Sequence, residues 1–121
     1  MAKTPEGRCK DEIKKQTPLL LPNSLFYMPV QSGYGRSGVS DFIGCVPLTI
    51  TQAAVGQTFG LFVANEAKSS IGNPTTLQAD FLMEVINAGG EGIVTRGKRN
   101  VVSTLTGLRE ALIAKGLIPQ G

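Results

Sequence analysis

Histidine is absent from this chain of 121 residues, and its absence excludes several classes of enzyme. Without an imidazole there is no Ser-His or Cys-His nucleophile pair and no zinc site built on histidine ligands. Acid–base chemistry near neutral pH then depends on carboxylates, lysine, tyrosine or a metal-bound water. Candidate catalytic residues must therefore be sought mainly among the acidic side chains and the lysines.

Cysteine and long apolar segments are also scarce. Cys9 and Cys45 are the two cysteines, and their spacing is not that of a metal site, so we expect both to be small buried apolar residues. No apolar run approaches the roughly 20 residues that span a bilayer. The N-terminus has no apolar stretch of the kind found in signal peptides. These absences predict a cytoplasmic protein without a membrane partner.

The length and the charge set further bounds. A chain of 121 residues is long enough for one compact domain and too short for two, so we expect a single domain over residues 1–121. Its 41% hydrophobic and 17% charged residues are typical of a globular protein. The net charge of +3 permits an anionic partner without requiring one.

Capping and turn signals divide the chain into elements. Thr4 and Pro5 are typical of a helix start, and Pro18 and Pro22 are expected to stop that helix. The order α-β-β-β-α-β-α predicts an α/β domain with one mixed sheet flanked by helices. The expected elements are a helix over 5–16, strands over 25–30, 41–46 and 58–68, a helix from 73 to about 88, a strand over 92–95, and a helix over 101–115.

Two of these helices carry apolar residues at helical spacing, which predicts the faces that they bury. In the helix that starts near Asn73 and Pro74, the apolar stripe comprises Leu77, Phe81, Leu82, Val85 and Ile86. In the last helix, it comprises Val102, Leu105, Leu108 and Leu112.

The strongest candidate site lies on the second and third expected strands. Asp41 opens one strand, and Glu66 and Lys68 are two residues apart near the end of the other. Because side chains alternate between the faces of a strand, Glu66 and Lys68 should point the same way, with Ala67 pointing into the core. If the two strands pair, the two carboxylates and the lysine converge at one edge of the sheet. Such a cluster can hold a hard divalent cation and position a water or a phosphate, which predicts a metal-dependent phosphodiesterase.

Several segments in a fixed order carry a family resemblance. They are Pro5-Glu6-Gly7, residues 28–38, Asp41-Phe42-Ile43, residues 62–68, Gln78 and Ala88-Gly89-Gly90. With these segments the chain resembles the virus-type replication-repair nuclease domain (VRR-NUC), a branch of the PD-(D/E)xK nuclease superfamily. The resemblance covers nearly the whole chain. It implies a restriction-endonuclease-like fold and suggests a phage or prophage origin.

The resemblance also implies roles for individual residues. Asp41, Glu66 and the backbone carbonyl of Ala67 would hold Mg²⁺ or Mn²⁺, and Lys68 would be the catalytic lysine. Glu6 would be an acidic residue near the metal, and Gln78 a polar helix residue that faces the site. The implied substrate is branched DNA such as a four-way (Holliday) junction, cut by a homodimer, and no nucleotide cofactor is expected.

Basic and aromatic residues outside this cluster are candidates for contact with DNA. Arg36 stands in the glycine-rich loop that leads to Asp41, and Tyr34 in the same loop offers an aromatic ring to a distorted strand. Further cations could contact backbone phosphates, although they could equally be solvated surface charges. These cations are Lys14, Lys15, Arg96, Lys98 and Arg99.

Two questions stay open at the level of sequence. Residues 47–60 are apolar, contain glycine and lack charge, which is consistent with a dimer interface or with a long loop folded on its own domain. The same chemistry could act on flaps, nicks or ends rather than on junctions. A non-catalytic DNA-binding module with an inert acidic cluster is the alternative from a different functional class.

Overall fold

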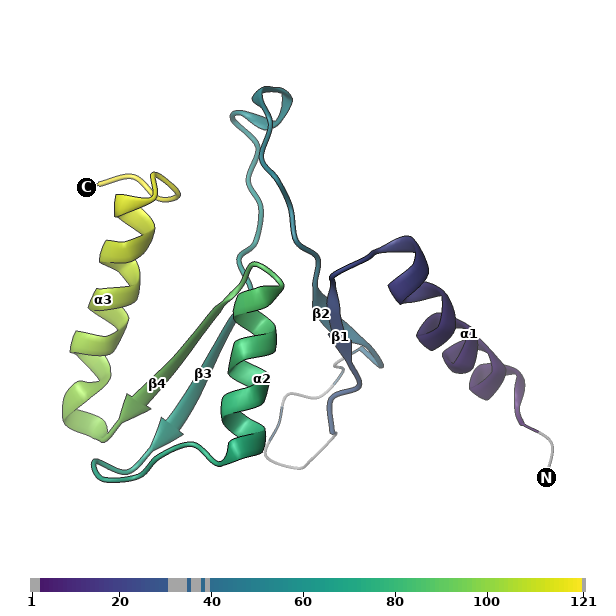
Figure 1. Ribbon diagram of the computed structural model, residues 1–121, viewed down its shortest axis with the longest axis horizontal. Coiled ribbons are helices and arrows are strands. Elements are labelled where there is room, and N and C mark those ends of the chain that lie inside the picture. Colours follow the sequence, from purple (N-terminus) through teal and green to yellow (C-terminus); the bar gives the residue numbers. More distant parts are fainter. Residues whose placement is uncertain (1–2, 31–34, 36–37, 39, 121) are drawn as a thin grey trace.

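The computed structural model describes residues 3–30, 35, 38 and 40–120, and it shows an α/β protein of extended shape (Figure 1). The described part of the chain contains three α-helices, four strands and two short 3-10 helices. In chain order they are α1 (Pro5–Leu20), β1 (Leu25–Tyr27), β2 (Ile43–Cys45), η1 (Gln52–Ala54), β3 (Val63–Lys68), α2 (Thr76–Asn87), β4 (Glu91–Arg96), η2 (Lys98–Asn100) and α3 (Val101–Ala114).

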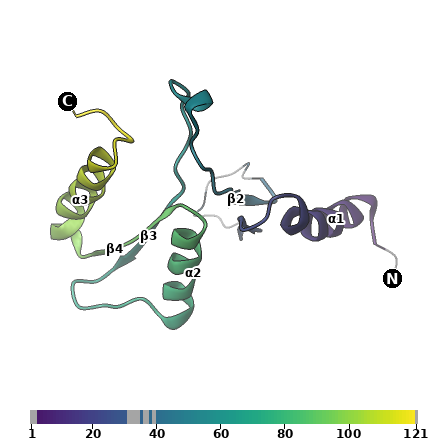
Figure 2. The same ribbon diagram turned by 45° about the horizontal axis from the view of Figure 1, so that its top comes forward.

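Helix α1 begins as its sequence predicts and ends later. The Thr4 hydroxyl accepts a hydrogen bond from the backbone N–H of Gly7, which confirms Thr4 as the N-cap. The expected stop before Pro18 is wrong, because Pro18 lies inside the helix, which continues to Leu20. Upstream of the proline, the Thr17 hydroxyl donates to the Ile13 carbonyl. The helix extends away from the other two helices (Figures 1 and 2), and Cys9 on it is exposed rather than buried.

The strands form two sheets of two strands each, so the expected single mixed sheet is wrong. Strands β1 and β2 are antiparallel, with Phe26 opposite Gly44. A Cβ atom at Gly44 would lie 2.3 Å from the Leu25 carbonyl oxygen, so only glycine fits there. This sheet contacts α2 through Tyr27 and Phe81, whose rings meet edge to face at 5.4 Å.

The second sheet belongs to a β3–α2–β4 unit. Strands β3 and β4 are parallel and in register, with Ala64 beside Gly92 and Lys68 beside Arg96. Helix α2 covers the face on which Gly92 stands, since a Cβ atom at Gly92 would lie 2.8 Å from the Leu82 carbonyl oxygen. Glycine therefore permits the close approach of this helix to the sheet.

Helix α2 supplies the buried core. Leu82, Val85 and the C-cap residue Ala88 are its buried apolar side chains. The rest of the expected stripe is less covered, with Leu77 82% and Ile86 45% exposed. The expected N-cap at Asn73 is wrong, because Thr75 caps the helix in a reciprocal arrangement with Gln78. Gly89 follows the helix with φ +95°, a conformation that glycine adopts without strain.

Helix α3 departs most from the prediction. It was expected to bury four apolar residues, yet the structure buries no residue of this helix. Val102 is 77% exposed and Leu105 47% exposed. An ion pair of 3.0 Å between Lys115, just after the helix, and Glu91 joins it to the start of β4. Leu108 and Leu112 are half-buried, so the apolar face of α3 is only partly covered.

A long connection joins the two sheets. Residues 46–61, which we call the arm, leave β2, rise above the rest of the molecule and return to β3 (Figure 1). Only the short helix η1 interrupts their irregular course. Within the described residues, no helix combines the length and the apolar character needed to cross a membrane.

Candidate nuclease site

Glu66 and Lys68 occupy the same face of β3, as the alternation of side chains predicts. Their charged atoms, Glu66 Oε1 and Lys68 Nζ, are 3.6 Å apart, and their side chains are 29% and 21% exposed. The face is the one covered by α2, because in-register neighbours in a parallel sheet share a face and Ala64 is in register with Gly92. The pair is therefore partly withdrawn from solvent.

Ala67 does not point into the core, and this part of the prediction is wrong. Exposed and half-buried residues alternate along β3, and Ala67 is among the exposed ones. The reason is that α2 packs on the face of the charged pair, while the opposite face is only partly covered. On that opposite face the Thr95 hydroxyl donates to Asn65 Oδ1 at 2.8 Å.

The backbone carbonyl of Ala67 faces the open edge of β3. The carbonyls of Phe62 and Lys68 accept hydrogen bonds from the backbone of Glu91 and Gly97, at the two ends of β4. Because carbonyl directions alternate along a strand, the carbonyl at position 67 points away from β4. Within the described residues β3 pairs with β4 alone. This oxygen is therefore at an unpaired strand edge, where it can accept a ligand.

Asp41 and Glu6 form a second cluster, around Lys10. The Lys10 Nζ atom is 3.9 Å from Glu6 Oε1 and 4.0 Å from Asp41 Oδ1. The side chain of Asp41 is 60% exposed and that of Glu6 74% exposed. Glu6 and Lys10 are four residues apart on α1, a spacing at which opposite charges pair. The contact between Lys10 and Asp41, which lies far along the chain, was not predicted from the sequence.

Asp11, which lies near this cluster on α1, pairs with Lys3. A hydrogen bond from the Lys3 ammonium, reinforced by the charges of Lys3 and Lys14, holds the pKa of Asp11 below its usual value. The Asp11 side chain is 46% exposed, so this is an ion pair on the surface of α1.

The strands that carry Asp41 and Glu66 do not pair with each other, contrary to the expectation. Asp41 precedes β2, which pairs with β1, whereas Glu66 lies on β3, which pairs with β4. Among the residues that the structure describes, no three acidic or cysteine side chains come together as a metal-binding group. The donor atoms themselves suit Mg²⁺ and Mn²⁺, because carboxylate and carbonyl oxygens are their usual ligands.

Gln78 and Arg96 have structural partners at the carboxyl end of β3. The Gln78 side chain accepts a hydrogen bond from the Thr75 backbone at 2.9 Å, which completes the cap of α2. The Arg96 guanidinium donates to the Gly72 carbonyl and to Asn73 Oδ1, both at 2.9 Å. Both side chains thus hold the loop between β3 and α2, next to Lys68. The sequence predicted that Gln78 faces the site and left Arg96 as either a phosphate contact or a solvated charge; it did not predict these hydrogen bonds.

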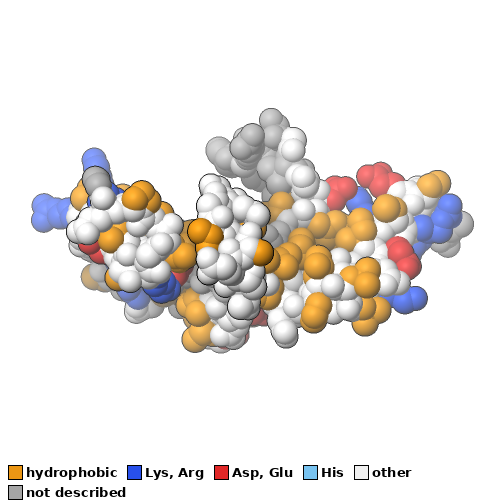
Figure 3. Space-filling view, turned by 90° about the horizontal axis from the view of Figure 1, so that it is seen from above, with side chains coloured by type: hydrophobic (Ala, Val, Ile, Leu, Met, Phe, Trp, Pro, Cys, Tyr) orange, Lys and Arg blue, Asp and Glu red, His pale blue; other side chains and the backbone are white. Residues whose placement is uncertain are grey.

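The remaining candidate DNA contacts are distributed along the molecule. Lys14 and Lys15 are exposed on α1, and Lys98 and Arg99 are exposed in η2. In the view of Figure 3, basic side chains lie at the two ends of the molecule rather than on one continuous face. Tyr34 and Arg36 lie outside the described residues. Lys98 and Arg99 lie two and three residues after Arg96. Arg96 is in register with Lys68.

Comparisons of this chain with protein-family models, with curated proteins and with solved structures find no match. The expected resemblance to VRR-NUC nucleases therefore rests on the sequence motifs of the chain alone.

Proposed function

We propose that this protein is a metal-dependent endonuclease that hydrolyses phosphodiester bonds in DNA. The observation that carries the proposal is the Glu66-Ala67-Lys68 segment of β3. Its two charged side chains share one partly buried face with 3.6 Å between their charged atoms, and the carbonyl between them faces an open edge. This arrangement supports the role that the ExK strand has in PD-(D/E)xK nucleases, which the motif order of the chain resembles.

Each residue of the proposed site has its own role in hydrolysis of the phosphodiester bond. Glu66, Asp41 and the Ala67 carbonyl would hold Mg²⁺ or Mn²⁺, which when bound lowers the pKa of a coordinated water and offsets charge on the phosphate. Lys68, kept in place by Glu66, donates a hydrogen bond to a phosphate oxygen as negative charge builds on it. The oxygen of a water would bond to the phosphorus as the bond from phosphorus to one bridging oxygen breaks, which leaves a phosphate end and a hydroxyl end and forms no covalent bond to the protein.

In this scheme Asp41 must lose its contact with the Lys10 ammonium and bind the divalent metal ion instead. Its present partner, the Lys10 ammonium, is 4.0 Å away, and both groups are partly in solvent. Ion pairs of this kind contribute about 0–1 kcal/mol, so losing the Lys10 contact costs little. Asp41 precedes β2 in the other sheet, however, and must move to the edge of β3 before it can share a cation with Glu66. Glu6 stands beside the same lysine and would gain the freed ammonium as its partner.

The proposed substrate is a four-way junction, cut by a homodimer. The chain carries one Asp41/Glu66/Lys68 set, whereas a junction is resolved by two cuts in strands related by two-fold symmetry. Two copies joined by an isologous interface supply two such sets in matching orientation. The alternatives are a nuclease of the same chemistry for flaps, nicks or ends, and a module that binds DNA without cutting it.

Cleavage of a labelled four-way junction, a flap, a nicked duplex and an intact duplex tests the proposal. Each substrate is incubated with the wild-type protein in Mg²⁺, in Mn²⁺ and in EDTA. We expect cleavage of the junction in either metal and none in EDTA. Binding of the junction without cleavage in both metals would overturn the proposal in favour of the non-catalytic module.

The variant Glu66→Gln, with Glu110→Gln as its control, tests whether Glu66 is required for cleavage. Glu66→Gln removes one negative charge and keeps the shape of the side chain, so we expect it to abolish cleavage while the unfolding midpoint changes little. Glu110→Gln removes the same charge from the exposed surface of α3 and should cleave like the wild type. Full activity of Glu66→Gln would refute the assigned site.

A further inference from the structure

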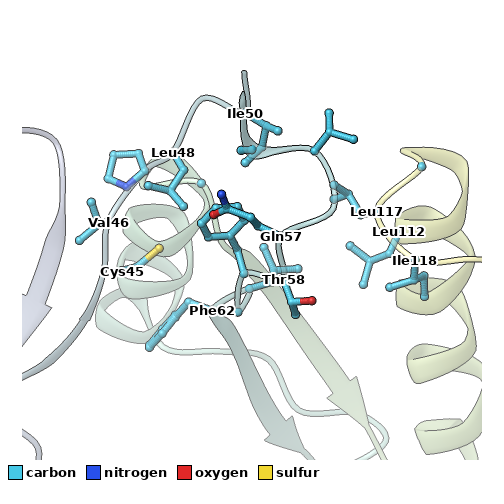
Figure 4. A pocket seen from close by; sticks show the side chains of 18 of the residues that line it. Cys45, Val46, Leu48, Ile50, Gln57, Thr58, Phe62, Leu112, Leu117 and Ile118 are labelled. Carbon is cyan, nitrogen blue, oxygen red and sulfur yellow. The ribbon is translucent and has the colours of Figure 1, made fainter. Parts of the chain in front are cut away.

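The two ends of the β3–β4 sheet differ in chemical character. A hollow of about 520 Å³ lies at the amino ends of the strands, between the arm and the C-terminal end of α3, and none of the described residues that line it is charged. Figure 4 shows Leu48 and Ile50 on one side of this hollow and Leu112 and Leu117 on the other. A phosphate would lose its hydration there without gaining a partner. The carboxyl ends of the strands, where Lys68 lies, are therefore the end that suits a nucleic acid.

At the carboxyl ends, two cationic residues are neighbours. Lys68 and Arg96 are in register on the parallel strands β3 and β4, so their side chains leave the same face of strands that are about 4.8 Å apart. Glu66 is on this face as well, and its carboxylate is 3.6 Å from the Lys68 ammonium. A guanidinium binds a carboxylate through two parallel hydrogen bonds and is the stronger competitor for it. Glu66 therefore stays with Lys68 only while Arg96 is bound elsewhere.

The loop between β3 and α2 binds Arg96. The guanidinium donates from Nε to the Gly72 carbonyl and from Nη2 to Asn73 Oδ1, both at 2.9 Å. Two donors of a planar fork thus meet two acceptors, a geometry that a lysine ammonium does not provide. Gly97, the next residue after Arg96, donates its N–H to the Lys68 carbonyl at 2.9 Å. The end of β4 therefore holds the chain at Lys68 and again at residues 72 and 73.

We propose that Arg96 is a positioning residue for Lys68 in the nuclease site, rather than a contact for a DNA phosphate. Because the loop binds the guanidinium, the Glu66 carboxylate is left to direct Lys68, and the loop itself is fixed next to that lysine. Without the loop contacts the guanidinium competes for Glu66, and Lys68 loses the partner that orients it. The inference rests on the proposed nuclease function and adds a residue that acts on the rate through Lys68.

Two substitutions of Arg96 separate positioning from phosphate contact. Arg96→Lys keeps the positive charge without the planar fork, and Arg96→Gln removes both. We expect both variants to bind the four-way junction with the affinity and salt dependence of the wild type, and to cleave it about 100-fold more slowly at saturation, as a small misplacement of a catalytic group does. Wild-type cleavage by Arg96→Lys would overturn the inference, because charge alone would then suffice. A salt slope flattened by about 0.9 in Arg96→Gln would also overturn it, since that change marks a lost phosphate contact.

Lys115→Ala is the matched control for the stability of β4. Lys115 pairs at 3.0 Å with Glu91, at the other end of this strand, so the variant also removes a cation that joins β4 to its surroundings. We expect Lys115→Ala to cleave at the wild-type rate, with thermal unfolding used to choose an assay temperature at which every variant is folded. A loss of rate equal to that of Arg96→Gln would contradict the inference, because weakening β4 at either end would then be enough.

Asn73→Ala tests the same contact from the side of the loop, at an exposed position where folding is less at risk. The variant removes one acceptor of Arg96 and leaves the Gly72 carbonyl, so we expect cleavage about 10-fold slower, the equivalent of one hydrogen bond to a charged group. Adding Asn73→Ala to Arg96→Gln should cost no further rate, because both changes break one contact. A wild-type rate for Asn73→Ala, or full additivity in the double variant, would refute the assigned role.

Hydrogen exchange in EDTA and without DNA gives a readout that does not depend on cleavage. The backbone amides of Gly72 and Gly97 donate hydrogen bonds of 3.1 and 2.9 Å at the two ends of this contact, and both should exchange faster in Arg96→Gln than in the wild type. Unchanged exchange, or an unchanged rate of cleavage, in Arg96→Gln would overturn this inference alone. A wild-type protein that cleaves no DNA substrate would overturn the proposed function and this inference together.

Discussion

At the residue scale, the carboxylate of Glu66 and the ammonium of Lys68 hold each other on a partly buried face. The contact fixes the direction of a side chain that would otherwise sample many rotamers, at a strand end where a phosphate can approach. An ammonium so positioned can act on a transition state without reorganising first. Lys68 is therefore the residue whose removal best separates catalysis from stability.

Lys68→Ala should lower the cleavage rate by roughly 100- to 1000-fold, the usual cost of losing one group that stabilises developing charge. Lys115→Ala is a matched control, because Lys115 also pairs with a glutamate, Glu91, at 3.0 Å. Single-turnover cleavage of the junction measures both rates, and thermal unfolding checks that both variants fold. Equal rates for the two variants would mean that Lys68 serves only as the ionic partner of Glu66.

At the element scale, the β3–α2–β4 unit is the ordered centre of the protein. Helix α2 is capped at its N-terminus by Thr75 and Gln78 and contributes the buried side chains that cover one face of the sheet. The hydrogen bonds of Arg96 to the loop at residues 72 and 73 join β4 to the start of this helix. The site residues on β3 therefore depend on how this one helix begins.

Gln78 can be tested for capping and for catalysis separately. Gln78→Ala removes one half of the reciprocal cap and should lower the free energy of unfolding by about 1 kcal/mol. Gln78→Glu retains the cap, because glutamate serves equally well at this position, and should unfold like the wild type. If Gln78 also faces the substrate, the added charge in Gln78→Glu should slow cleavage. Wild-type cleavage by a stable Gln78→Glu would assign this residue to capping alone.

At the scale of the whole molecule, the arm is free of charge while the basic side chains are spread over several other elements. The arm carries no charge, whereas exposed basic residues lie on α1 and just before it, in η2, and on and just after α3. DNA bound at the end of β3 would reach η2 first, because β4 leads directly into it. If the protein acts as the proposed nuclease, Lys98 and Arg99 are therefore the first candidates for phosphate contacts, and Lys14 and Lys15 are candidates for contacts with more distant parts of the substrate.

Replacing Lys98 and Arg99 together by alanine should weaken binding of the junction and flatten its dependence on salt. If each residue neutralises one phosphate, the slope of log K against log salt falls by about 1.8. Lys115→Ala, which removes a cation paired with Glu91, serves as the control and should leave the slope unchanged. Binding isotherms at several salt concentrations measure the slopes. A wild-type slope for the double variant would make Lys98 and Arg99 ordinary surface charges.

The local features of the fold were predictable from the sequence, because they depend on neighbouring residues. The N-cap of α1 at Thr4, the end of α2 at Gly89 and the shared face of Glu66 and Lys68 follow from capping chemistry and from the periods of helices and strands. The α/β class follows from the same signals. Pro18 was misjudged because the last turn of α1 tolerates a proline that a local rule treats as a stop.

Only the tertiary structure decided which surfaces meet. The sequence pattern of a strand does not specify which strand it pairs with. In this protein β2 pairs with β1 rather than with β3. Asp41 therefore lies beside Lys10 and apart from the sheet that carries Glu66. An apolar stripe shows that a helix face avoids water, but not what covers it, and the stripe of α3 is only partly covered, with Val102 and Leu105 exposed. The sequence alone determined the charge-free arm and the acidic motif. Their surroundings depend on contacts between distant segments.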